Sequence, residues 1–168
     1  SSFGVSKVNS KDQLAPAIRK AMMESPEVMV EQYLKGTEIS IGCYKTKKKS
    51  VVLPATEVVT NNEFFDYDAK YNGQVQEITP ARLNEDTARR VAELTSHIYD
   101  ILHCNGIIRI DYIICRGLNK DGEEVDKIYM LEVNTTPGMT ATSFIPQQVK
   151  AAGLNMADVL TEIVENQF

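Results

Sequence analysis

The chain has 168 residues, which suits a single domain with a hydrophobic core. Its 43% hydrophobic and 24% charged residues indicate a soluble globular protein and exclude a disordered one. A net charge of −5 argues against nucleic acid or an anionic membrane as a partner, and no apolar stretch approaches the roughly 20 residues that cross a bilayer. The three cysteines, Cys43, Cys104 and Cys115, lack CxxC spacing, which predicts reduced thiols and a cytoplasmic protein.

The first half of the chain predicts one helix followed by extended segments. Residues 10–13 have the pattern of a capping box, which favours a helix that ends near residue 23. Pro26 then favours an extended strand over residues 28–33. Alternating residues predict a half-buried strand over 38–44, and a basic hairpin tip leads back through residues 50–59. We interpret the basic tip as a solvated turn rather than a nucleic-acid site.

A long irregular segment separates this hairpin from the second half of the chain. No period is evident from residue 60 to residue 80, and a loop of this length is more often functional or disordered than neutral. Asn84 can cap the helix that follows, in which Val91, Leu94, Ile98 and Leu102 recur at three- and four-residue spacing.

The second half of the chain predicts a hairpin and two closing helices. We expect strands over 107–115 and 127–133, joined by a polar loop, and then a helix over 145–152 and a last helix capped by Asn155. Helices and strands are mixed, but hairpins join most of the strands. The pattern therefore predicts an α+β fold with an antiparallel sheet rather than a doubly wound parallel sheet.

Two pairs of polar residues interrupt the apolar runs of the predicted hairpin. Glu132 and Asn134 are two residues apart, so in an extended strand their oxygen atoms lie on one face. Arg109 and Asp111 share a face in the same way. Hard cations such as Mg²⁺ take oxygen ligands of this kind, usually one or two carboxylates together with nucleotide phosphates. With the Pro-Gly turn at 137–138, the two pairs predict a site for a metal-bound phosphate.

Five segments, in order, resemble the C-terminal ATP-grasp portion of the D-alanine–D-alanine ligase family. They are SSFGVSKV at 1–8, VEQYLKGTE at 30–38, FFDYDAKY at 64–71, LHCNGIIRIDY at 102–112 and LEVNTTPGMTATSFIP at 131–146. The resemblance implies an ATP-grasp fold over residues 1–168, with a mainly antiparallel sheet flanked by helices. It also implies that ATP phosphorylates one D-alanine and that the amine of a second D-alanine attacks the acyl phosphate.

The resemblance assigns the catalytic and metal residues position by position. Asp111, Glu132 and Asn134 match the ligands of Mg²⁺ or Mn²⁺, and Arg109 with the backbone N–H of Gly138 would stabilise the oxyanion. Ser143 would hold the carboxylate of the second D-alanine, although Phe144 stands next to it where the family often has leucine. Ser1 would hydrogen-bond Tyr71, and this pair would orient the substrate amine.

The resemblance likewise assigns the nucleotide site. Glu31, Gln32, Tyr33 and Leu34 match the adenine-binding hinge at the end of an apolar strand, and Glu38 matches the carboxylate that binds the ribose. Ser2 would cover the phosphates, and Lys70 would contact the γ-phosphate side of the nucleotide.

The chain begins at Ser1 in a small loop, without an initiator methionine, so we expect a fragment of a longer protein. The family's separate N-terminal domain would complete the site, the full-length form would be a homodimer, and the fragment alone would be inactive.

Four other interpretations of the function remain open. They are a D-alanine–D-lactate ligase, a D-alanine–D-serine ligase, another ATP-grasp carboxylate–amine ligase, and a nucleotide-binding regulatory module without catalysis.

Overall fold

The computed structural model describes residues 3–60 and 75–168, and the chain separates into two compact units. The first unit falls within Ser1–Leu34 and Val59–Gln76, and the second within Lys35–Val58 and Glu77–Phe168. Of the predicted catalytic residues, Arg109, Gly138 and Ser143 belong to the second unit. None of the helices in the described ranges combines the length and the apolar character needed to cross a bilayer.

The first unit contains helix α1 (Lys11–Ala21), close to its predicted position. Ser10 occupies the N-cap position, but its side chain does not cap the helix; instead the Oε1 atom of Gln13 accepts a 2.9 Å hydrogen bond from the backbone N–H of Asn9. The helix includes Pro16 and buries none of its residues.

The strand predicted over residues 28–33 is absent, so this part of the sequence interpretation was wrong. A β-strand requires a neighbouring strand to pair with its backbone groups, and none of the described strands pairs with this segment. The apolar side chains that suggested the strand are exposed, Met29 by 78% and Val30 by 69%.

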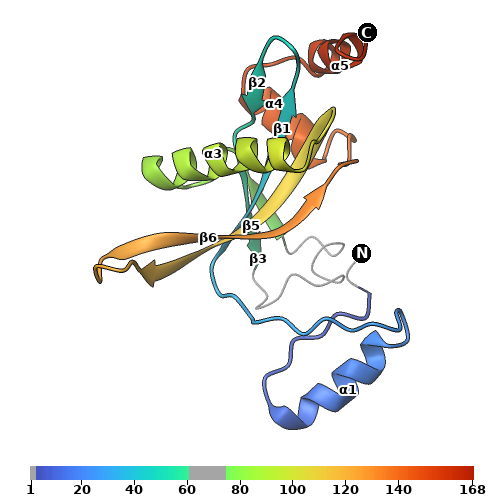
Figure 1. Ribbon diagram of the computed structural model, residues 1–168, viewed down its shortest axis with the longest axis vertical. Helices are drawn as coiled ribbons and strands as arrows, with labels where there is room; N and C mark the ends of the chain where they lie inside the picture. The colour runs from blue at the N-terminus through green and yellow to red at the C-terminus, as the bar shows by residue number, and fades with distance from the viewer. Residues whose placement is uncertain (1–2, 61–74) are drawn as a thin grey trace. The chain divides into compact units, whose positions relative to one another are not determined.

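The second unit contains most of the strands of a six-stranded sheet. Figure 1 draws the strands as arrows. Within the described residues the strand order is β4-β3-β1-β5-β6, and β2 also pairs with β1. Every pairing with a described register is antiparallel, which confirms the predicted sheet type. The strands are β1 (Thr37–Lys45), β2 (Ser50–Val52), β3 (Thr56–Thr60), β4 (Val75–Ile78), β5 (Ile107–Leu118) and β6 (Glu124–Asn134).

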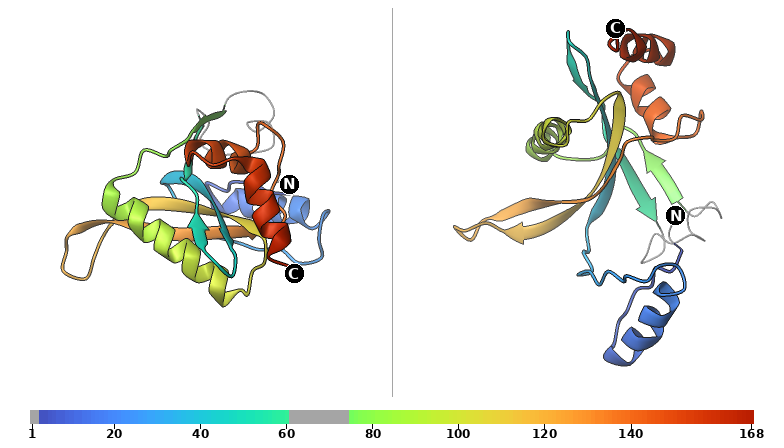
Figure 2. Two further views of the ribbon diagram at one scale, coloured as in Figure 1. Left: turned by 90° about the horizontal axis from the view of Figure 1, so that it is seen from above. Right: turned by 45° about the vertical axis from the view of Figure 1, so that its right-hand side comes forward.

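Helix α3 (Glu85–Ile101) packs on one face of the sheet (Figure 2). It begins as predicted, because the Oδ1 atom of Asn84 accepts a 2.9 Å hydrogen bond from the backbone N–H of Thr87. The predicted apolar stripe is correct at Val91 but not at Leu102, which follows the helix and is 53% exposed. The core on this face comprises Ile39, Ile41, Cys43, Val91, Tyr99, Ile108, Ile110, Tyr112 and Ile114.

Helices α4 (Phe144–Ala151) and α5 (Met156–Glu165) lie on the opposite face (Figure 2). The predicted cap of α5 is confirmed, because the Oδ1 atom of Asn155 accepts hydrogen bonds from the backbone N–H groups of Ala157 and Asp158. The second core comprises Tyr44, Leu53, Ile107, Ile145, Val149 and Val159. Since successive strand residues face opposite sides, Ile108 and Ile110 of β5 face α3, whereas Ile107 and Arg109 face α4.

The basic turn between β1 and β2 is held against both helical layers. Lys45 forms a 2.8 Å ion pair with Asp100 at the end of α3, and Lys49 forms a 2.7 Å ion pair with Glu162 in α5. Lys45 and Lys49 thus form ion pairs within the fold. The antiparallel pairing of β1 with β2 confirms the predicted hairpin turn.

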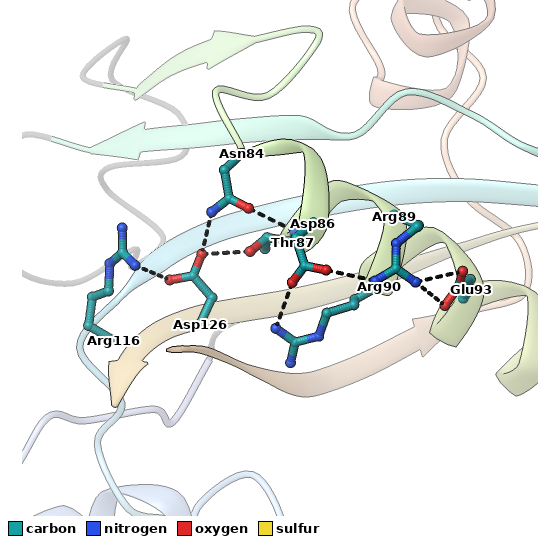
Figure 3. Close-up of polar contacts among 8 residues, drawn as sticks. All are labelled: Asn84, Asp86, Thr87, Arg89, Arg90, Glu93, Arg116 and Asp126. Atoms are coloured by element: carbon teal, nitrogen blue, oxygen red, sulfur yellow. Dashed lines mark hydrogen bonds and ion pairs between the residues drawn. The ribbon is translucent and has the colours of Figure 1, made fainter. Parts of the chain in front are cut away.

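The long β5–β6 hairpin is attached to the start of α3 through Asp126 (Figure 3). The Oδ2 atom of Asp126 accepts a 2.6 Å hydrogen bond from the Thr87 hydroxyl and a 2.9 Å hydrogen bond from the Asn84 side chain. Arg116, on the neighbouring strand, approaches the other oxygen atom at 3.2 Å. The same residue that caps α3 therefore also ties the hairpin to it.

Candidate functional site

The four residues that predicted a metal-bound phosphate lie directly opposite one another on two neighbouring strands. Arg109 near the start of β5 pairs with Asn134 at the end of β6, and Asp111 pairs with Glu132. Cross-strand partners in an antiparallel sheet share a face, so all four side chains lie on the face that also carries α4. The structure thus brings together two pairs that the sequence could only place on separate strands.

Arg109 is held by a bidentate ion pair. Its Nε atom donates to Oδ1 of Asp111 at 3.0 Å and its Nη2 atom donates to Oδ2 at 2.8 Å. The same Nη2 atom lies 3.7 Å from Oε1 of Glu132. A guanidinium fixed in this way presents its remaining N–H groups in a defined direction, which suits the recognition of phosphate or an oxyanion.

The two carboxylates of the site differ in their access to solvent. The side chain of Asp111 is 15% exposed, whereas that of Glu132 is 66% exposed. Glu132 can therefore bind a ligand from solvent without losing a buried partner. Asp111 also accepts a 2.6 Å hydrogen bond from the hydroxyl of Ser40, which lies opposite it on β1.

The loop after β6 brings Gly138 and Ser143 together. A Cβ atom added at Gly138 would lie 2.8 Å from the Ser143 hydroxyl oxygen, so only glycine fits at this position without displacing Ser143. The Ser143 hydroxyl is 2.8 Å from that of Thr140, and Ser143 occupies the N-cap position of α4 without capping it through its side chain. The serine hydroxyl is thus kept at the loop rather than used by the helix.

Phe144, the first residue of α4, connects this loop to the charged pair. The centre of its ring lies 5.4 Å from the Cζ atom of Arg109, within the range of a cation–π contact. Through this contact Arg109 is flanked by Asp111 on its own strand and by the start of α4.

The oxygen donors on this face fit a hard divalent cation. Asp111 and Glu132 supply carboxylates, and Asn134 supplies an amide oxygen that accepts a 3.0 Å hydrogen bond from the backbone N–H of Thr136. No group of three or more His, Cys, Asp and Glu side chains that could hold a metal is found in the described ranges, and this face has two carboxylates, so its third oxygen donor is the Asn134 amide. Two carboxylates and one amide are the kind of donor set that Mg²⁺ uses when phosphate oxygens complete its shell.

The predicted nucleotide residues divide between the two units. Glu38 lies on β1, on the face of Ser40 and two positions before it, and is half-buried. Glu31, Gln32, Tyr33 and Leu34 belong to the first unit, where the Nζ atom of Lys7 lies 4.2 Å from the centre of the Tyr33 ring. Their role at a base-binding hinge stays a prediction. Ser1, Ser2, Lys70 and Tyr71 lie outside the described residues.

Sequence reasoning missed Ser40 and Gln148. Ser40 could have been found from the alternation of β1, because it lies on the same face as Glu38. Gln148 is buried with Ile145 and Val149 on the apolar side of α4. A polar residue at a position where the helical period predicts an apolar one could have identified it. Both side chains are buried. The hydrogen bond of Ser40 to Asp111 is given above, and those of Gln148 are described below.

The comparisons with known proteins agree on one protein family. The family described as "D-ala D-ala ligase C-terminus" matches residues 1–165. The D-alanine–D-alanine ligase of Bacteroides fragilis is 66% identical over all 168 residues, and the chain spans 49% of that relative's length. The chain thus covers about half of the curated relatives that it matches.

Solved structures agree with this similarity. The VanG D-Ala:D-Ser ligase from Enterococcus faecalis superposes with a TM-score of 0.81 and 31% identity, over 100% of this chain and 47% of that one. The D-alanine–D-alanine ligase of Bacillus anthracis complexed with ATP superposes with a TM-score of 0.69 and 32% identity, over 95% of this chain and 48% of that one.

Proposed function

We propose, from the premise that this chain belongs to the family of D-alanine–D-alanine ligase C-terminal domains, that the full-length protein joins two D-alanines with ATP. The antiparallel sheet flanked by helices is the ATP-grasp fold of its structural relatives. The observation that carries the proposal is the placement of Arg109 and Asp111 directly opposite Asn134 and Glu132, beside the loop of Gly138 and Ser143. The product, D-alanyl-D-alanine, serves peptidoglycan synthesis.

The residues of this face act by binding and by neutralising charge. Arg109 stabilises the charge that develops on the transferred phosphoryl group and on the tetrahedral oxyanion, and the N–H of Gly138 adds a second donor. Ser143 holds the carboxylate of the second D-alanine, whose amine then attacks the acyl phosphate and displaces phosphate. Because Asp111 already fixes the guanidinium, little reorganisation is needed during the reaction.

Asp111, Glu132 and Asn134 hold Mg²⁺ or Mn²⁺ in this proposal. A divalent cation supplies neutralisation of phosphate charge and orientation of the nucleotide. Glu38 binds the ribose, Gln32 and Leu34 recognise the base through their backbone, and Glu31 and Tyr33 complete the hinge. Ser2 and Lys70 contact the phosphates, and Ser1 with Tyr71 orients the attacking amine.

The proposal is tested with the full-length protein that contains this chain. We expect release of phosphate from ATP that depends on D-alanine and Mg²⁺, with D-alanyl-D-alanine identified by mass spectrometry. Arg109→Lys keeps the charge but loses the bidentate geometry, and we expect it to lower kcat by about 10²-fold. Arg89→Ala is the matched control, because Arg89 is an exposed α3 residue with local ion pairs only. A protein that binds ATP but forms no dipeptide would contradict the ligase and favour a regulatory nucleotide-binding module.

A second candidate function is ligation of D-alanine to D-serine. The observation that favours it is the similarity to the VanG D-Ala:D-Ser ligase. Equal concentrations of D-alanine, D-serine and D-lactate in one reaction distinguish the products. We propose that D-alanine is preferred and that Tyr71 disfavours D-lactate, so an excess of D-alanyl-D-serine or depsipeptide would overturn this choice.

We further propose that the full-length protein is a cytoplasmic homodimer. The cytoplasm supplies ATP, and it keeps thiols such as the three free cysteines of this chain reduced. Light scattering of the full-length protein measures the assembly directly, and a monomeric mass at working concentrations would contradict it.

A further inference from the structure

Strand β1 has a gap in its hydrogen-bond ladder that a side chain fills. Its pairing with β3 stops at Ser40 and Thr56, and its pairing with β2 starts at Cys43 and Val52. Between these points the Oε1 atom of Gln148 accepts a 2.8 Å hydrogen bond from the Gly42 N–H, and its Nε2 atom donates to the Ser40 carbonyl oxygen at 2.9 Å. Gln148 thereby supplies the donor and the acceptor that a neighbouring strand would supply.

The fit between α4 and β1 at this gap is close and fully buried. Gln148 is 0% exposed, and its Nε2 atom also lies 3.1 Å from the hydroxyl of Thr56. A Cβ atom added at Gly42 would lie 2.6 Å from the Cδ1 atom of Ile145 and 2.9 Å from Oε1 of Gln148. The helix therefore rests directly on the strand backbone, and the carboxamide sets where along the strand it rests.

The same helix and the same strand also meet at the candidate site. On the strand side, the Ser40 hydroxyl donates to Asp111, and Asp111 binds Arg109. On the helix side, Phe144 lies over Arg109, one turn before Gln148. The contacts form a closed circuit from Gln148 through Ser40, Asp111, Arg109 and Phe144 back to α4. Buried polar networks of this kind rigidify the elements that they join.

We propose that Gln148 is a positioning residue for the second substrate. It fixes α4 on β1, so that Ser143 and Phe144 at the start of the helix keep their places beside Gly138 and Arg109. This inference rests on the proposed function, since Ser143 is there the residue that holds the carboxylate of the second amino acid. Of the proposed nucleotide residues, Glu38 lies on β1, but its place is set by pairing with Val58 of β3 and Ile113 of β5 rather than by Gln148. We therefore expect binding of ATP to depend little on Gln148.

The test uses the full-length protein with Gln148→Met, which keeps the shape of the side chain and removes its hydrogen bonds. We expect the KM of the second D-alanine to rise roughly tenfold through misplacement of Ser143. We expect kcat to change by less than about threefold and the KM of ATP to stay constant, because the interaction lost is one of substrate binding. Thr95→Val is the matched control: it removes a buried 2.9 Å hydrogen bond to Tyr112 on the opposite face of the sheet, and all three constants should stay unchanged.

Hydrogen exchange separates this inference from the proposed function. In Gln148→Met, the Gly42 amide and residues 143–148 should exchange faster than in Thr95→Val, whether or not the protein is a ligase. If Gln148→Met does not fold, Gln148→Glu replaces it. This variant keeps an acceptor for Gly42 and loses the amide donors to Ser40 and Thr56, so its readout is the exchange of residues 143–148. Unchanged exchange at residues 143–148 in the variant that folds, or a rise in the KM of ATP as large as that of D-alanine, would overturn the positioning role. Absence of dipeptide from the unmodified protein would instead overturn the proposed function.

Discussion

Ser40 and Asp111 face each other across β1 and β5 and share a 2.6 Å hydrogen bond. The Oδ1 atom of Asp111 therefore accepts from two groups, the Ser40 hydroxyl and the Nε atom of Arg109. Ser40 is only 2% exposed, so water cannot easily replace its hydroxyl. The orientation of Asp111, a proposed metal ligand, thus depends on Ser40, which is not itself a proposed ligand of the metal.

We expect Ser40→Ala to weaken binding of the divalent cation to the full-length protein about tenfold, because partners that orient a metal ligand commonly contribute 10–100-fold in affinity. Titration of Mn²⁺ in the presence of ADP, followed by electron paramagnetic resonance, measures this directly. Ser40→Thr retains the hydroxyl and should restore most of the affinity. Ser50→Ala, at an exposed position of β2, should have no effect. Equal affinities of Ser40→Ala and the unmodified protein would show that Asp111 needs no such support.

Glu132→Gln should leave the fold intact and lower kcat by about 10²–10³-fold, the usual effect of removing a group that stabilises transition-state charge. The side chain of Glu132 is 66% exposed, so its replacement by a neutral amide leaves no buried group unpaired. Phosphate release at saturating Mg²⁺ and D-alanine gives kcat. Glu124→Gln, at the exposed start of the same strand, serves as control. Near-normal turnover of a folded Glu132→Gln protein would exclude Glu132 as a metal ligand.

Cys43 should resist alkylation in the folded protein. Burial raises the pKa of its thiol to about 12, so almost no reactive thiolate exists at pH 8. Brief treatment with iodoacetamide, followed by peptide mass spectrometry, should label Cys104 and Cys115 before Cys43, because both are only partly buried. Cys43 should become reactive in urea. Labelling of all three cysteines at one rate in the native protein would contradict the burial.

Most elements of the second unit could be predicted from local patterns. Asn84 and Asn155 cap helices as expected, because a cap depends on residues within one turn. The face shared by Arg109 and Asp111 followed from the two-residue period of a strand. Their register with Glu132 and Asn134 could not be predicted, because it depends on the register shift between Asp111 and Tyr112 and on the turn of the hairpin.

The errors arose where a segment depends on distant partners. Residues 28–33 have the composition of a strand but lack a strand neighbour in the described part of the chain. Ser40 and Gln148 were overlooked because their contacts, with Asp111 and with the backbone of β1, join residues 71 and 106–108 positions apart. Periodicity predicts which residues are buried, but it does not predict which buried polar groups form hydrogen bonds with one another.

Asp126 should stabilise the β5–β6 hairpin in a pH-dependent way. The hydrogen bond from Thr87, with the one from Asn84 and the charge of Arg116, lowers the pKa of Asp126 in the folded state. A lowered folded pKa means that this stabilisation is complete above the unfolded value, near 3.8, and is lost as the pH falls through the lower folded value. At neutral pH, Asp126→Asn should cost about 1–3 kcal/mol, because it weakens the part-buried hydrogen bond from Thr87 and the exposed one from Asn84 to a charged acceptor. Hydrogen exchange of the hairpin amides at pH 7 and pH 3 measures the effect.

Protection in Asp126→Asn should be lower at pH 7 by about five- to 150-fold, and the difference should shrink at pH 3. Asp121→Asn, at the exposed hairpin turn, should match the unmodified protein at both pH values. A difference that persists undiminished at low pH would show that the charge of Asp126 is not what holds the hairpin to α3.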